Sequence, residues 1–112
     1  MQVEIGKAYT DGENNLVLIF EMKDYKSAKY PDHNLRAIRF KEDYQFSLDT
    51  YTEEGRFFTN ESLKFDLYQE ADEAHLYKVM TNLKPRDLKE CDIWLDKFYK
   101  AYVKRNSNEA PE

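Results

Sequence analysis

The chain is poor in the residues on which several common protein chemistries depend. It has one cysteine, Cys91, and only three glycines among 112 residues. A single cysteine cannot close an internal disulfide, so a disulfide framework is excluded and a reducing compartment is favoured. The glycines stand at positions 6, 12 and 55, a spacing that forms neither a P-loop nor a GxGxxG motif. The sequence therefore argues against the common kinds of nucleotide-dependent enzyme, and we expect no cofactor.

Long hydrophobic runs are also missing. The longest, Leu16–Phe20, is far shorter than the roughly 20 residues that a membrane-spanning helix needs. The first nine residues, MQVEIGKAY, show no basic segment followed by an apolar one, so no secretory signal is indicated. We therefore expect a cytoplasmic protein without membrane association. Its length fits one domain, predicted over 1–105, followed by a disordered polar tail over 106–112.

Metal-ligating and nucleophilic residues are few and scattered. His33, His75 and Cys91 fall in three separate predicted elements, whereas a metal site needs clustered ligands. Cys91 lies on an apolar helical stripe, where it is expected to pack as a small hydrophobic side chain. No serine stands in the GxSxG context of a nucleophile elbow. We predict no catalytic site and no metal site, and hence a protein that is not an enzyme.

Aromatic residues, in contrast, are abundant. They make up 15% of the chain, with nine tyrosines, seven phenylalanines and one tryptophan. Each large aromatic side chain can bury about 150–250 Å², so a domain of this size cannot enclose all of them. Some tyrosines must therefore face water, and exposed tyrosine is common in binding surfaces.

Strand-like alternation dominates the first two thirds of the chain. Successive side chains of a strand point to opposite faces, so apolar residues at every second position indicate a half-buried strand. The run at 16–20 is apolar throughout and indicates a strand covered on both faces. Strands are predicted at 2–9, 16–22, 35–41, 44–52, 57–59 and 63–68, with hairpin turns at 10–15 and 52–56 and an exposed loop at 24–34.

From residue 70 the apolar period changes to three and four residues, which indicates helices. The first helix is predicted over 70–83, because the Lys84–Pro85 step disfavours helical backbone. Asp87 and Glu90 have the spacing of a capping box, so a second helix is predicted from there to residue 105. The predicted buried stripe of the first helix consists of Ala71, Ala74, Tyr77, Met80 and Leu83.

Strands followed by helices indicate an α+β fold. We predict a five- to six-stranded antiparallel sheet or small barrel, SH3-like or OB-like in size, followed by two C-terminal amphipathic helices. A homodimer through the last helix is expected if Trp94 and Tyr99 widen its apolar stripe beyond what one sheet can cover.

The charge is unevenly distributed. Acidic residues outnumber basic ones by 22 to 17, for a net charge of −5, and this balance argues against nucleic-acid binding through phosphates. Between positions 53 and 73, seven acids accompany two basic residues. One interpretation is an ordinary solvated surface, and the other is a face that occupies a basic surface of a partner protein. The predicted partner-binding residues are Tyr51, Glu53, Glu54, Arg56, Glu61, Glu70, Asp72 and Glu73.

The leading hypothesis is thus a non-enzymatic, acidic protein-binding module, whose partner is basic or handles nucleic acid. Immunity proteins, antitoxins and phage-encoded inhibitors act in this way, and the analogy is with their class alone. A less favoured hypothesis, the third, is a small-ligand site or a minor enzyme with its site in the 24–34 loop.

The alternative is a single-stranded nucleic-acid-binding or structural module on an OB-like barrel. Interleaved basic and aromatic side chains can stack bases on an open sheet face. The competing structural interpretation is that Arg39 and Lys41 pair across the sheet with acids such as Glu42 or Asp49. The predicted nucleic-acid face consists of Arg36, Arg39, Lys41 and Tyr44.

Overall fold

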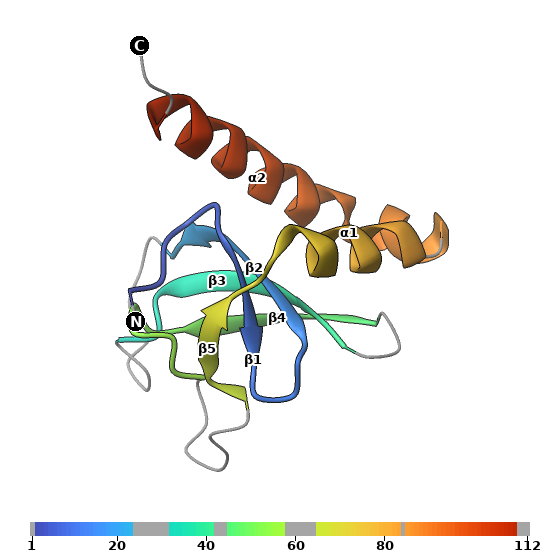
Figure 1. Cartoon of the computed structure of the whole chain (residues 1–112). Helices are drawn as coiled ribbons and strands as arrows, with labels where there is room; N and C mark the ends of the chain where they lie inside the picture. The colour runs from blue at the N-terminus through green and yellow to red at the C-terminus, as the bar shows by residue number, and fades with distance from the viewer. Residues whose placement is uncertain (1, 24–31, 42–44, 58–64, 84, 110–112) are drawn as a thin grey trace.

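The computed structural model describes residues 2–23, 32–41, 45–57, 65–83 and 85–109. Within this part of the chain, one antiparallel sheet of five strands is followed by two helices (Figure 1). The strands are β1 (Ala8–Asp11), β2 (Leu16–Met22), β3 (Leu35–Phe40), β4 (Phe46–Tyr51) and β5 (Leu67–Glu70), and the helices are α1 (Glu73–Asn82) and α2 (Pro85–Glu109). This order confirms the predicted α+β fold with two C-terminal helices.

The strand order in the sheet is β4-β3-β2-β1-β5. The first four strands form an antiparallel meander, and β5 then returns to pair with β1. β4 and β5 are therefore the edges, and of the two predicted alternatives the open sheet is correct. The turn after β4 nevertheless reaches β5, because the Leu67 N–H donates to the Gly55 carbonyl at 2.8 Å.

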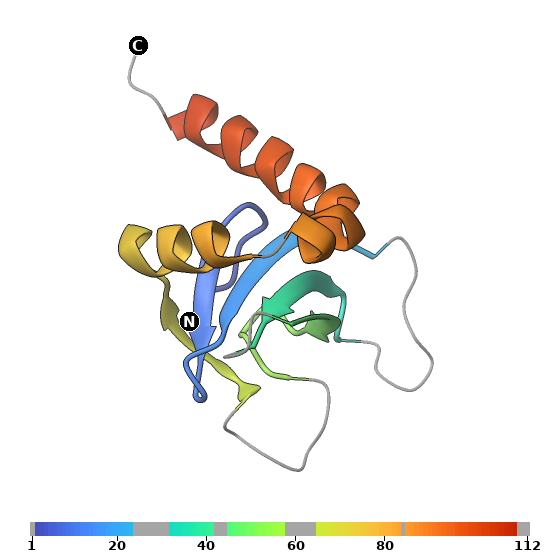
Figure 2. The ribbon, with the colours of Figure 1, turned by 90° about the vertical axis from the view of Figure 1, so that its right-hand side faces the viewer.

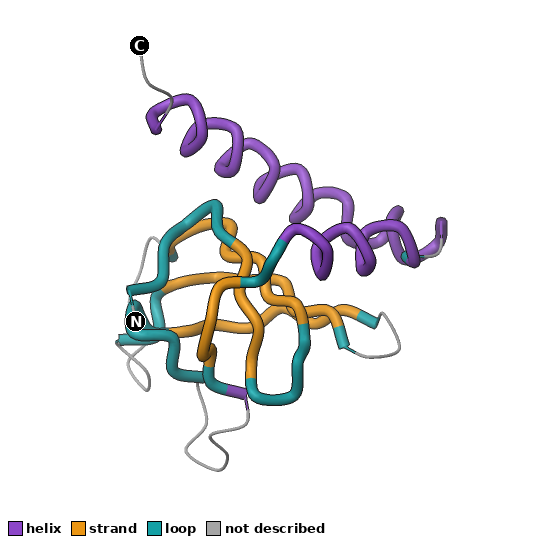
Figure 3. Tube along the Cα trace, viewed as in Figure 1, coloured by secondary structure: helices purple, strands orange, loops and turns teal. Residues whose placement is uncertain are grey.

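Both faces of the sheet carry a core, as the fully apolar run in β2 predicts. The helices lie over one face, as Figures 2 and 3 show. The core under them contains Leu16, Leu18, Phe20, Ile38 and Phe40 from the sheet, with Val79, Leu83, Cys91 and Phe98 from the helices. The core of the opposite face contains Val3, Tyr9, Val17, Ile19, Leu35, Ala37, Tyr51 and Leu67. Alternate residues of β2 therefore belong to different cores.

The first strand begins later than predicted. Gly6, with φ of +88°, turns the chain ahead of it, so β1 covers Ala8–Asp11 instead of residues 2–9. A Cβ at Gly6 would lie 2.8 Å from the Ala101 carbonyl oxygen of α2, so glycine is required there. The predicted hairpin follows β1, and Asp11 Oδ1 accepts from the backbone N–H of Asn15 at 3.0 Å.

The change from strand to helix also lies further along the chain. β5 extends to Glu70, which was predicted to begin the first helix, and α1 starts at Glu73. The inward face of α1 coincides only in part with the predicted stripe. Leu76, Val79 and Leu83 face inward, whereas Tyr77 is 72% exposed. Of the predicted stripe, Ala71, Met80 and Leu83 do pack against the core, whereas Ala74 and Tyr77 are exposed.

The last helix is longer than predicted. α2 starts at Pro85, so Asp87 is not its cap. Proline suits a first helical position, since its missing N–H would have no intrahelical partner there. The helix continues to Glu109, through the first part of the predicted tail, because Asn106–Asn108 weaken a helix without breaking it. Cys91 is fully buried on this helix, as predicted.

Candidate partner-binding surface

Tyr51, the one aromatic residue in the predicted partner-binding set, is not on the surface. Its side chain is 0% exposed and its ring packs against Phe57, with 5.6 Å between the ring centroids. Burial raises the pKa of the Tyr51 hydroxyl. In the strand register, Leu48 lies opposite Ile38 on the helix side of the sheet, and Tyr51 lies opposite Leu35 on the other side. Tyr51 is buried because that second side carries a core of its own. Tyr51 is therefore a structural residue.

The remaining predicted acids fall into two separate groups. Glu53 and Glu54 are exposed in the turn that contacts Leu67, at the start of β5. Glu70 lies at the other end of that strand and leads into α1. Arg56 is exposed with the first group, Asp72 and Glu73 belong to the second, and Glu61 lies outside the described residues. The structure thus divides the predicted surface.

The second group is held by well-defined local structure. The Ala71 N–H donates to the Ala8 carbonyl at 2.9 Å, which continues the β1–β5 pairing for one more residue. Asp72 then has extended backbone and caps α1, because its Oδ1 accepts from the His75 N–H at 2.7 Å. Glu73 follows in the first turn, where a carboxylate interacts favourably with the helix dipole. The carboxylates are therefore presented on an ordered backbone.

Two exposed tyrosines stand on either side of these acids in the sequence. Tyr68 is 56% exposed and stands two residues before Glu70 in β5. Tyr77 is 72% exposed and lies one helical turn after Glu73. We call this set of residues the β5–α1 surface; it consists of Tyr68, Glu70, Asp72, Glu73 and Tyr77.

Open clefts border the β5–α1 surface on both sides. Glu70, Ala71 and Asp72 line both a cleft of about 780 Å³ and a second one of about 260 Å³. The larger cleft continues over Thr10, Phe40, Lys41, His75 and Lys78, and the smaller over Gly6, Leu76, Phe98 and Tyr102. The junction is thus a ridge between two depressions, a shape that can interlock with a partner surface.

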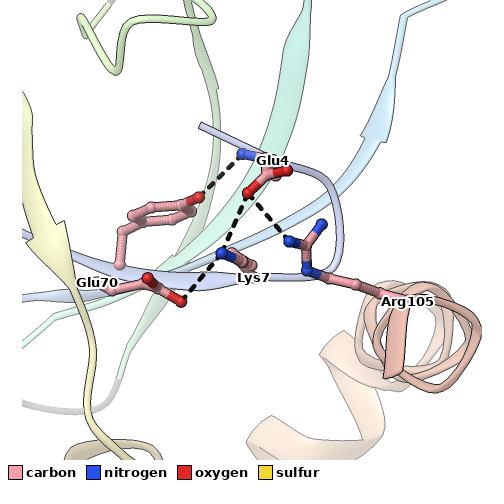
Figure 4. Close-up of polar contacts among 5 residues, drawn as sticks. Glu4, Lys7, Glu70 and Arg105 are labelled. Carbon is pink, nitrogen blue, oxygen red and sulfur yellow. Dashed lines mark hydrogen bonds and ion pairs between the residues drawn. The ribbon is translucent and has the colours of Figure 1, made fainter. Parts of the chain in front are cut away.

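A network of ion pairs anchors the ridge to the rest of the fold (Figure 4). Lys7 lies 3.5 Å from Glu70 and 3.1 Å from Glu4, and Arg105 of α2 contacts the same Glu4 oxygen at 3.0 Å. The hydrogen bond from Lys7, followed by the charge of Arg105, lowers the pKa of Glu4. The hydrogen bond to Glu4 raises the pKa of Lys7. Sequence reasoning missed this network, because its members are up to 101 positions apart.

The predicted nucleic-acid face is not a single surface. Arg36 lies on the helix side of β3 and pairs with Glu21, which also contacts Lys97 of α2 at 3.1 Å. Lys41 is exposed beyond the end of β3. Tyr44 lies outside the described residues.

Arg39 lies on the opposite face of β3 from Arg36 and is only 8% exposed. Its Nε is 3.3 Å from Asp49, and its guanidinium carbon lies 5.1 and 4.7 Å from the ring centroids of Phe57 and Phe65. The cross-strand pairing with Asp49 confirms the structural interpretation of Arg39. This side chain is not available to stack on bases.

The third hypothesis falls largely outside the described residues, because the loop is described only from Asp32. His33 lies at its end, with Nε2 3.2 Å from the Phe57 carbonyl oxygen. Across the described part of the chain, no three His, Cys, Asp or Glu side chains are grouped as metal ligands would be. Neither described helix has the length and apolar character to cross a membrane.

Comparison of the chain with protein-family models, with curated proteins and with solved structures gives no match. The geometry of the β5–α1 surface is therefore the basis for assigning a function.

Proposed function

We propose that this protein is a non-enzymatic binding module whose β5–α1 surface docks on a basic surface of a partner protein in the cytoplasm. The observation that supports the proposal is the exposure of Tyr68 and Tyr77 next to three exposed carboxylates. Tyrosine is enriched among the residues that dominate binding energy at interfaces. Carboxylates attract a basic partner over a distance and accelerate its association.

The ordered backbone supports the same function. Asp72 is fixed by its cap to His75, and Glu70 is held near Lys7, so little conformational entropy is lost when a partner binds. Binding would cover the basic surface of the partner, so that its other ligands could not reach it. An inhibitor, of the immunity or phage-encoded type, is the form of this function that we favour.

The decisive experiment compares two charge-neutralised variants as baits in extracts of the native host. The first is Glu70→Gln/Asp72→Asn/Glu73→Gln; asparagine caps a helix about as well as aspartate, so α1 is retained. The control is Glu53→Gln/Glu54→Gln, in the turn at the other end of β5. We expect the control to retain the partner of the wild-type protein and the first variant to lose it.

With the partner purified, association should be about tenfold slower for the triple variant at low salt, and this difference should disappear at high salt. Tyr77→Ala should weaken the affinity at every salt concentration, by roughly fivefold or more. A partner that binds the triple variant normally and loses the turn variant would contradict the assignment of the surface.

A further inference from the structure

α2 has a second face that the fold leaves uncovered. Its inner side holds Cys91 and Phe98 in the core, with 0% and 8% exposure. Figures 1 and 2 show that the sheet and α1 lie to one side of this helix, which runs along the outside of the molecule. Trp94, which was expected to widen the apolar stripe, is half-buried. It packs within the chain against Phe46, with 6.1 Å between the ring centroids. The uncovered face must therefore be defined by other residues.

Four residues form a stripe along the outer side of α2. Ile93 and Val103 are 57% and 42% exposed, and the side chains of Asp96 and Lys100 are 58% and 76% exposed. Their spacings of three, four and three residues are those of the contact positions in a two-helix coiled coil. Tyr99, 64% exposed, flanks the stripe. An outer stripe of this spacing is the kind of face that packs on another helix.

The stripe is complementary to itself. Ile93 and Val103 are equally far from residue 98 on either side, and so are Asp96 and Lys100. When two copies of α2 pack antiparallel about a two-fold axis at residue 98, Ile93 lies beside Val103 of the other copy. Asp96 likewise lies beside the other copy's Lys100. A symmetric interface requires this property, because each copy offers the same patch.

From this pattern we infer that the outer face of α2 binds a second copy of the chain, as an antiparallel helix pair. The charges select this orientation. Parallel helices in register would place Asp96 beside Asp96 and Lys100 beside Lys100, and like charges across a helix interface are unfavourable. The antiparallel arrangement replaces the intrachain Asp96–Lys100 pair, at 2.9 Å, with two equivalent pairs between the copies. This proposed self-association uses none of the residues of the β5–α1 surface.

The dimer is expected to be weak and dependent on concentration. One face of a single helix gives an interface at the low end of specific interfaces, so we expect a dissociation constant on the order of 10 µM. Each copy contributes only two apolar side chains to the stripe. Sedimentation equilibrium of the full chain, from about 1 to several hundred µM, covers this range.

Charge reversal tests the inferred contact directly. Lys100→Asp makes Asp96 face an aspartate, and Asp96→Lys makes Lys100 face a lysine, so each variant alone should remain monomeric at concentrations where the wild type dimerises. A mixture of the two variants restores both opposite-charge contacts. It should form a one-to-one heterodimer with an affinity within a few fold of the wild-type homodimer.

A matched control for Lys100→Asp is Lys78→Asp on α1. It makes the same change in net charge at an exposed position away from the stripe. It should dimerise like the wild type. Circular dichroism shows whether each variant keeps its helices. The two α2 variants lose only the exposed Asp96–Lys100 ion pair within the helix, so we expect the helices to be retained. A wild-type chain that stays monomeric throughout, or a mixture of the two variants that fails to associate, would overturn the inference.

Discussion

Two regions of this molecule hold charged side chains in opposite ways. On the sheet face away from the helices, Arg39 and Asp49 are paired, with 9% and 12% of their side chains exposed. Two phenylalanine rings cover the guanidinium. At the β5–α1 surface, Glu70, Asp72 and Glu73 are exposed. The first region uses its charges to maintain the fold, whereas the second presents carboxylates to solvent.

The charge balance of a segment thus does not show whether its charges maintain the fold or face a partner. A buried pair offsets the desolvation of each partner, so the loss of one partner leaves an uncompensated charge in the interior. An exposed carboxylate is stabilised by water and can be neutralised at little cost in stability. The two regions should therefore respond differently to the same kind of substitution.

The largest expected effect is from Asp49→Asn. The substitution removes the countercharge and leaves the buried guanidinium of Arg39 unpaired, which should lower the free energy of unfolding by about 3 kcal/mol. Urea denaturation measures this quantity. The matched substitution at the exposed region, Glu73→Gln, should change it by less than about 0.5 kcal/mol.

The double variant Arg39→Met/Asp49→Val separates the pair from its surroundings. It removes both charges together, so it should be more stable than Asp49→Asn, by about 1–3 kcal/mol. Equal stability of the single and double variants would show that the ion pair is not what this region depends on, and the contrast with the β5–α1 surface would then fail.

The next effect concerns Tyr51, which shares the buried region. Burial raises the pKa of its hydroxyl above the ordinary value of 10.0. The folded state therefore holds the proton more tightly than the unfolded state. The stabilisation is complete below about pH 10 and declines as the pH rises above it, by up to about 1.4 kcal/mol per pH unit.

Tyr51→Phe removes this titration. The difference in unfolding free energy between the wild type and the variant, measured by denaturation from pH 8 to 11, should shift in favour of the variant above pH 10. Tyr9, whose pKa is also raised by burial, is present in both proteins and cancels in the comparison. A difference that does not change with pH would mean that the Tyr51 hydroxyl is solvated in the folded state.

A smaller effect is expected at Asp72, which combines both kinds of role. Asp72→Ala removes the cap of α1 and should lower the unfolding free energy by about 1 kcal/mol. Asp72→Asn retains a cap and removes only the charge, so stability should change by a few tenths of a kcal/mol. Partner association should slow in both variants. Slowing in the alanine variant alone would assign Asp72 to the fold and not to binding.

The sequence predicted the fold where periodicity was strong and unopposed. The apolar run in β2, the turn after Asp11 and the buried Cys91 all follow from local patterns, and the class and order of the elements are confirmed. The residues at which an element begins or ends were less predictable where a strand pattern and a helix pattern overlap. Around Glu70 an alternating and a helical pattern share the same residues, and the pairing of β5 with β1 decided in favour of strand.

The candidate surface was predictable only in part, because exposure depends on tertiary packing. Glu70, Asp72 and Glu73 were identified from the acidic segment. Tyr51 was expected to be exposed, but its face of β4 carries a core of its own. Tyr77 was missed because helical spacing put it on the predicted buried stripe, and Tyr68 was not included in the predicted set. A tyrosine can be buried or exposed at similar cost because its ring is apolar and its hydroxyl is polar.

The smallest effect on stability should follow from Lys7→Met. Lys7 joins Glu4 and Glu70 at the edge of the β5–α1 surface, with 26% of its side chain exposed. Exposed pairs of this kind contribute about 0.2–1 kcal/mol, so stability should fall only slightly. Glu70 would lose its countercharge, and the surface would become more negative.

Association of the purified basic partner with Lys7→Met should therefore be faster than with the wild type at low salt and equal at high salt. Lys89→Met, at an exposed position on α2, makes the same change in net charge at a residue outside this surface. If both variants accelerate association equally, the total charge of the protein steers the partner. If only Lys7→Met does so, the steering field comes from the β5–α1 surface itself, because a screened potential falls off within about 8 Å at physiological salt.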